Sequence, residues 1–221
     1  MSAAALLRNL QSLLVRLYDA PVVQDAADYL ICDRAELQRL LGGQLSMSDE
    51  QVLLVQQHDE VRIALYIDAG VLERLAQSDP THALTEHNLA DFCTALEGIS
   101  HFHYLMWSLD CGRRVSLLEL ELQAEVDKYA SALLLLTRQA AGQFPVTLHA
   151  RLFDRVGYLP SLDAVSRTRY EEASRHAARY CRSLEQRFLQ RRRLRLEAWV
   201  LELRRFFRCG HQEKIRQLAI S

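Results

Sequence analysis

The chain has 221 residues, of which 49% are hydrophobic and 25% charged, and its formal net charge is −1. This length suits one large domain or two small ones, and the composition is ordinary for a globular protein that folds without disulfide or metal staples. No stretch of about 18 apolar residues occurs, which excludes a transmembrane helix and predicts no contact with a membrane.

The first third of the chain predicts a small α+β part, residues 1–84. Apolar residues at helical spacing predict a helix over 3–18, which Asp19-Ala20-Pro21 ends. Asp33 is placed to begin a further helix, which Gly42-Gly43 ends. Two runs rich in Val, Ile and Leu then flank His58-Asp59, and they predict one β-hairpin over 51–68. A lone hairpin is marginal in water, so we expect it to pair with another strand or with a second copy of the chain.

Residues 85–143 predict an acidic helical hairpin. Thr85 or Asn88 can cap a helix that runs to about Leu109, and Cys111-Gly112 ends it. Ser116 then begins the next helix, with Glu119 three residues later in the arrangement of a capping box. Because the connection is short, we expect the two helices to be antiparallel neighbours.

Residues 144–221 predict a connector followed by a basic helical part, which could form one compact domain with 85–143. The segment 144–161 has the most irregular sequence, and the pattern over 161–209 fits either one very long helix or two. Residues 1–150 carry a net charge of −10 and residues 151–221 a net charge of +9. The fold class is therefore mostly α: a helical bundle with one β-hairpin in the N-terminal third and a long basic C-terminal helix or helix pair.

Four polar residues in this bundle form a first candidate site. Glu97 and His101 are one helical turn apart, and Glu121 and Glu125 are one turn apart on the next helix. Such a cluster can be a polar network inside the core, a pair for proton transfer or a metal site. Di-iron bundles need Glu-x-x-His on two helices, whereas Glu-x-x-x-His occurs here once, so we expect a paired core network, no metal and no cofactor.

The basic C-terminal part offers a second candidate surface. Arginines alternate with aromatic residues, as in grooves that hold phosphates and bases, but the aromatic residues also follow the stripe of a packed core. The arginines could therefore bind nucleic acid, bind an acidic protein or pair within the chain. The expected partner-binding residues are Arg187, Arg191, Arg192, Arg193, Arg195, Arg204 and Arg205.

Within this part, Arg169 and His176 are seven residues apart, two turns along one helical face, with Tyr170 after the arginine. The spacing resembles the Arg-x4–6-His pattern of HEPN-type helical ribonucleases. The resemblance covers eight residues. It implies that His176 transfers a proton at a ribose oxygen and that Arg169 holds the phosphate charge.

No nucleophile motif and no phosphate-binding glycine loop is present. The sequence therefore favours a non-enzymatic, cytoplasmic interaction or adaptor protein, whose basic C-terminal face binds an acidic protein partner or nucleic acid, or which associates with itself. The five scattered cysteines, with no C-x-x-C pair, fit a reducing compartment. The alternative is a helical hydrolase that uses Arg169 and His176, or the cluster of Glu97, His101, Glu121 and Glu125.

Overall fold

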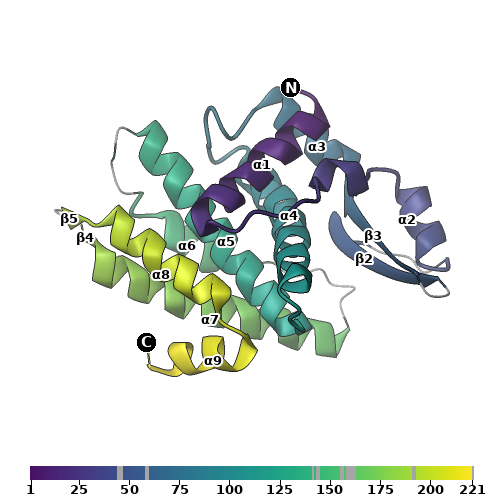
Figure 1. Cartoon of the computed structure of the whole chain (residues 1–221). Helices are drawn as coiled ribbons and strands as arrows, with labels where there is room; N and C mark the ends of the chain where they lie inside the picture. Colours follow the sequence, from purple (N-terminus) through teal and green to yellow (C-terminus); the bar gives the residue numbers. More distant parts are fainter. Residues whose placement is uncertain are drawn as a thin grey trace.

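The computed structural model describes residues 1–43, 47–57, 60–140, 142, 145–154, 157, 163–190 and 193–220. Within these ranges the chain is mostly helical, as the sequence predicts, with one small mixed sheet (Figure 1). The elements, in chain order, are α1 (Ala3–Tyr18), the 3-10 helix η1 (Ala26–Tyr29), β1 (Leu30–Ile31), α2 (Arg34–Leu40), β2 (Glu50–Gln57), β3 (Glu60–Ile67), α3 (Ala69–Gln77), α4 (Leu89–Asp110), α5 (Leu117–Gln139), α6 (Leu148–Phe153), α7 (Ala164–Phe188), β4 (Leu189–Gln190), β5 (Arg193–Leu194), α8 (Leu196–Arg208) and α9 (His211–Ile220). None of the helices in these ranges combines the length and apolar character needed to cross a bilayer.

Helix α4 lies at the centre of the molecule (Figure 1). It is apolar on most of its circumference, and α1, α3, α5 and the hairpin all pack against it, so it is buried on several sides. Helix α5 begins where the sequence predicts, because the Ser116 side chain accepts a hydrogen bond from the Glu119 amide at 3.2 Å. Helices α4 and α5 thus form the predicted helical hairpin, and α7 packs on the other side of α5.

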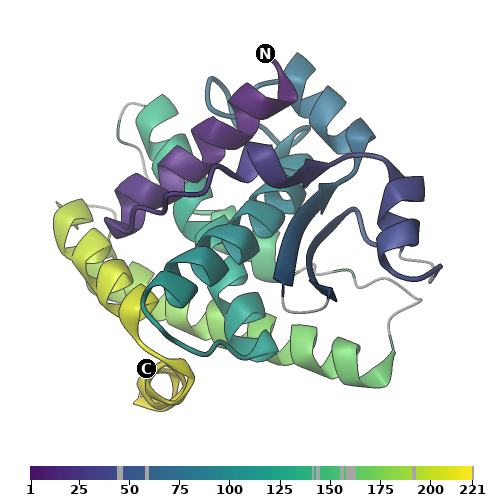
Figure 2. The ribbon, with the colours of Figure 1, turned by 45° about the vertical axis from the view of Figure 1, so that its right-hand side comes forward.

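The predicted β-hairpin is confirmed as the antiparallel pair β2 and β3, although His58 and Asp59 of its turn lie outside the described residues. The short strand β1 pairs with β3 in parallel, so one edge of the hairpin is covered by the chain itself. No other strand in the described ranges pairs with β2. The sheet packs against α4 (Figure 2), and this places the start of β2 beside the middle of that helix.

The basic C-terminal pattern forms two long helices, α7 and α8, joined by the two-residue strands β4 and β5. The helices lie side by side (Figure 1), and the rings of Tyr180 and Phe206 stack with their centroids 4.1 Å apart. Helix α6 lies within the segment 144–161 that the sequence marks as irregular, and α9 follows α8. One hydrophobic core extends from Leu6 to Leu218 and includes residues of all three expected segments.

Candidate functional site

The four predicted residues of the first candidate site come together between β2, α4, α5 and α7. Glu97 and His101 project from α4, and Glu121 and Glu125 project from α5 toward them. The structure adds three charged residues to this set. We call the complete group the Glu/His cluster; its members are Glu50, Glu97, His101, Glu121, Glu125, Lys128 and Arg169.

His101 lies between two carboxylates. Its Nδ1 atom is 3.6 Å from Glu50 Oε2, and its Nε2 atom is 3.4 Å from Glu121 Oε2. All three residues are buried. Burial alone would lower the pKa of His101, but Glu121 and Glu50 outweigh this effect and hold the pKa well above its ordinary value. Neither His101 Nε2 nor Glu50 Oε2 has a hydrogen-bond partner within the described ranges, which is uncommon for buried polar atoms.

Lys128 joins the two remaining carboxylates. Its ammonium group lies 2.7 Å from Glu97 Oε2 and 2.8 Å from Glu125 Oε1, which confirms the expectation that Glu125 is paired. Burial raises the pKa of Glu125, and Lys128 only partly offsets this. At Glu97 burial acts in the same direction, but Lys128 and His101 outweigh it and the pKa is lowered. The surroundings therefore shift the pKa values of these two neighbouring carboxylates in opposite directions.

Glu50 is the member that sequence reasoning missed. It lies at the first position of β2, 47 residues before Glu97, so no local pattern connects the two. The approach of Glu50 to α4 depends on Gly98, because a Cβ atom at this position would lie 3.2 Å from Glu50 Oε2 and 3.0 Å from Leu65 Cδ1. A glycine in the middle of a helix is a signal of such close approach and could have pointed to this contact.

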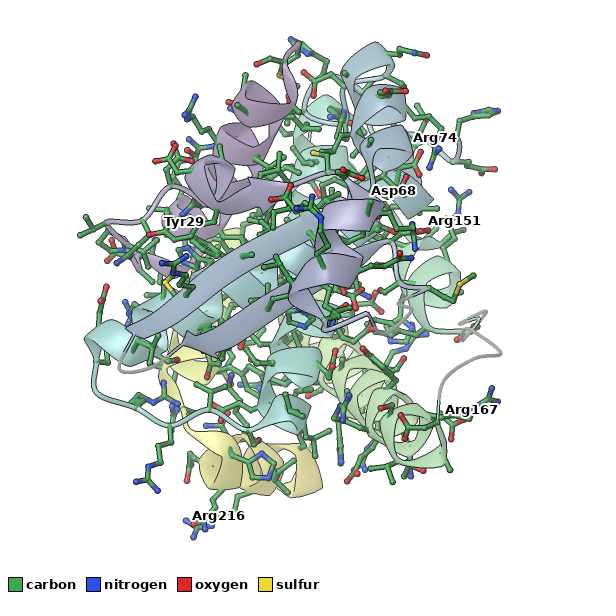
Figure 3. The ribbon with its side chains drawn as sticks, turned by 90° about the vertical axis from the view of Figure 1, so that its right-hand side faces the viewer. Tyr29, Asp68, Arg74, Arg151, Arg167 and Arg216 are labelled. Carbon is green, nitrogen blue, oxygen red and sulfur yellow. The ribbon has the colours of Figure 1, made fainter. Side chains whose placement is uncertain are left out.

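Arg169 connects the cluster to the other predicted catalytic pair. Its Nε atom lies 3.5 Å from Glu121 Oε1, whereas Arg167, two residues earlier, is exposed at the outer end of α7 (Figure 3). His176 Nε2 lies 3.6 Å from Glu172, and its Nδ1 atom has no hydrogen-bond partner within the described ranges. The structure thus places Arg169 in the Glu/His cluster, and within the same ranges no hydrogen bond or ion pair joins it to His176.

A second buried polar network lies on the opposite side of α5. Lys214 of α9 is fully buried, and its ammonium group donates hydrogen bonds to Tyr104 at 2.9 Å and to Gln123 at 2.7 Å. Asp127 accepts hydrogen bonds from Ser100, Gln123 and Tyr18. Burial lowers the pKa of Lys214 to about 7 and raises that of Asp127 to about 6. Sequence reasoning did not single out this network.

The predicted partner-binding arginines differ in their surroundings. Arg204 donates hydrogen bonds to the carbonyls of Leu17 and Arg16, at the end of α1, and Arg187 lies 3.3 Å from Glu202. Arg195 and Arg205 are exposed, and no ion pair involves them in the described part of the chain. Arg191 and Arg192 lie outside the described residues, and so does the side chain of Arg193.

The Glu/His cluster can accept, donate and hold protons, and its histidine and carboxylates are ligands that metal ions use. One donor atom each of Glu97, His101 and Glu121 lie within 4.8 Å of one another. Glu97 and Arg169, whose side chains are 19% and 22% exposed, form the edge of the cluster nearest to solvent. In comparisons with known proteins, the chain matches no family model, no curated protein and no solved structure.

Proposed function

We propose that the Glu/His cluster is the catalytic centre of a helical hydrolase. The observation that supports this proposal is the contact between Arg169 and Glu121, because it joins two candidate sets that the sequence suggests independently. Buried ion pairs are costly and contribute little to stability, and perturbed charged groups gather at functional sites. Seven charged or titratable side chains from four elements therefore favour a functional cluster over a purely structural one.

The chemistry of the cluster fits hydrolysis. A carboxylate such as Glu121 can take a proton from an attacking water, and positioned proton transfer contributes about 10²–10⁴ in rate. Arg169 and Lys128 supply fixed positive charge that can stabilise negative charge in a transition state. A substrate would reach these groups at the edge formed by Glu97 and Arg169.

The test is a comparison of hydrolysis by three proteins: the unaltered chain, Glu121→Gln and the control Glu171→Gln, which changes an exposed glutamate of α7. The substrates are single-stranded RNA, a phosphodiester, a phosphomonoester and a carboxyl ester. We expect turnover of one class, a loss of about 100-fold or more in Glu121→Gln, and no loss in the control. No turnover of any class, or full activity in Glu121→Gln, would overturn the proposal. RNA cleavage that is lost in His176→Ala and kept in Glu121→Gln would assign the reaction to the Arg169/His176 pair instead.

We also propose a second function, binding of an acidic partner, on the basis of the outer face of α8. Leu201 is 64% exposed there, one turn before the exposed Arg205. Arg195 at the start of this helix is exposed as well. An apolar residue near exposed arginines suits contact with an acidic protein or with nucleic acid.

The probe for this second function is a labelled single-stranded oligonucleotide. If it binds, the logarithm of affinity should fall linearly with the logarithm of salt by about 0.7 for each phosphate contact, and the double variant Arg195→Glu, Arg205→Glu should weaken binding and reduce the slope. Absence of binding at physiological salt would exclude nucleic acid as the partner. Salt-independent binding would contradict the role assigned to the arginines.

A further inference from the structure

The surroundings of His101 resemble those of a metal-binding histidine more than those of a hydrogen-bonded histidine in a protein core. Glu50 faces the Nδ1 atom, while Nε2 points toward Glu121 at 3.4 Å and has no hydrogen-bond partner within the described ranges. The His101 side chain is 90% buried, at 10% exposed, so water at the surface does not readily replace the missing partner. Histidines that bind metals usually direct one ring nitrogen at the ion and the other at a carboxylate or carbonyl that fixes the ring.

We propose that His101 Nε2 and the carboxylates of Glu97 and Glu121 bind one divalent transition-metal ion, and that Glu50 orients the imidazole from its other nitrogen. The three donor atoms lie within 4.8 Å of one another. Donors about 2.1 Å from a shared ion in tetrahedral geometry lie about 3.4 Å apart. His101 Nε2 and Glu121 Oε2 already have this separation, so the remaining adjustment is an inward movement of the Glu97 carboxylate by up to about 1.4 Å.

The fixed charges of the cluster fit an ion of charge +2. Four carboxylates, those of Glu50, Glu97, Glu121 and Glu125, share the space with two basic side chains, Lys128 and Arg169. With His101 neutral, as a ligand must be, two negative charges remain in the cluster. Lys128 holds Glu97 through Oε2, which leaves Oε1 for the ion.

The ligand types indicate which ions fit. One imidazole nitrogen and two carboxylates suit Mn²⁺, Fe²⁺, Co²⁺ or Zn²⁺ better than Ca²⁺ or Mg²⁺, which prefer oxygen ligands alone. As a statement about catalysis, the inference rests on the proposed hydrolase function, where a bound ion would activate water. Binding of the ion can be tested without a substrate.

The experiment uses the full chain, freed of metal by chelation and checked for folding by circular dichroism. Mn²⁺, Co²⁺ and Zn²⁺ are titrated by calorimetry, and the absorption spectrum of bound Co²⁺ reports its ligands. We expect one ion per chain. Glu121→Gln and His101→Gln should abolish this binding, and Glu50→Gln should weaken it about 10- to 100-fold while one ion per chain is retained. Glu171→Gln, an exposed carboxylate of α7, is the matched control and should bind as the unaltered chain does.

If Glu121→Gln or His101→Gln does not fold, Glu97→Gln provides the same test at the more exposed ligand. The inference is overturned if the folded chain binds none of the three ions, or if Glu121→Gln and Glu97→Gln bind as tightly as the unaltered protein. Metal bound without hydrolysis would contradict the proposed function and leave this site standing. Hydrolysis that persists after complete chelation would contradict a catalytic role for the ion and leave the proposed hydrolase function standing.

Discussion

Lys128 is the residue on which the charge balance of the Glu/His cluster depends most. Its side chain is 13% exposed, and it contacts Glu97 and Glu125 at the same time. We expect Lys128→Met to lower the free energy of unfolding at pH 7 by about 3 kcal/mol, because two partly buried carboxylates then lie close together without a counter-ion.

The decrease in the free energy of unfolding caused by Lys128→Met should become smaller at acid pH. Burial already raises the pKa of Glu125, and removal of the ammonium group raises it further, so the folded variant binds a proton more tightly than the unfolded chain does. Such a group gains stability as the pH falls. Urea unfolding at pH 7 and pH 5 measures the difference, and an equal loss at both values would show that the carboxylates do not cause it.

The substitution Gly98→Ala adds one methyl group at the contact between the sheet and α4, and it therefore tests how closely the two pack. In an open helix, Gly→Ala stabilises by about 0.5–1 kcal/mol. Here the added Cβ atom meets Leu65, which is fully buried, and Glu50, which is held beside His101. We therefore expect Gly98→Ala to destabilise the protein by about 1–3 kcal/mol in urea unfolding, as overpacked positions do. A stabilised variant would mean that β2 can move away from α4.

At the scale of elements, the basic C-terminal helices are partly held by the chain's own N-terminal helix. Helix α1 ends at Tyr18, with Asp19 in the left-handed region at φ 50°, and its last carbonyls need donors. The Arg204 guanidinium donates hydrogen bonds to the carbonyls of Leu17 and Arg16, and that of Arg208 donates one to the carbonyl of Asp19. Part of the positive charge of residues 151–221 therefore stabilises the fold.

Arg204 and its neighbour Arg205 form a matched pair that tests this role. We expect Arg204→Ala to destabilise by about 1–2 kcal/mol, because hydrogen bonds from a half-buried cation to two carbonyls are lost. Arg205 is exposed, and we expect Arg205→Ala to change stability by less than about 0.5 kcal/mol. Thermal unfolding of the two variants is the measurement. Equal effects would show that the contact with α1 contributes nothing specific.

The sequence predicts elements well where a local signal marks them. Ser116 and Asp33 each cap a helix at a predicted position, since a capping side chain acts within three residues. Strand β1 was not predicted, and the break between α7 and α8 was one of two alternatives that the sequence left open. The former depends on pairing with Leu65 and Tyr66, far along the chain, and no proline or glycine marks the latter. The same reason explains the site: helical spacing paired Glu97 with His101, but Glu50 and Arg169 reach the cluster only through tertiary packing.

At the scale of the whole molecule, the fixed position of α9 depends on Lys214, which connects the C-terminus to the central helices. Besides its hydrogen bonds to Tyr104 and Gln123, its ammonium group lies 4.2 Å from the ring centroid of Tyr104 and 5.1 Å from that of Phe206. Burial opposes its charge, whereas Glu119 and Asp127 favour it, and the result is a pKa of about 7.

This pKa makes stability depend on pH in a known direction. Between pH 7 and about 10, the unfolded chain keeps the Lys214 proton and the folded chain has lost it. The unfolded state then binds more protons, so stability increases with pH by up to about 1.4 kcal/mol per unit. Other groups oppose this trend: the raised pKa of His101 makes stability fall as pH rises above about 6.5, and the raised pKa of Cys181 does the same above about 8.5.

The contribution of Lys214 is therefore best isolated by comparison with Lys214→Met, which removes only the titrating group on α9 and leaves His101 and Cys181 unchanged. Urea unfolding of both proteins at pH 7, 8 and 9 gives the difference in their free energies of unfolding. We expect the free energy of unfolding of the unaltered protein to increase relative to that of Lys214→Met by about 1 kcal/mol per pH unit. The reason is that only the unaltered protein loses a buried positive charge in its folded state as the pH rises. A difference that is constant from pH 7 to pH 9 would mean that Lys214 keeps its proton in the folded state, held by Glu119 and Asp127 as a buried ion pair.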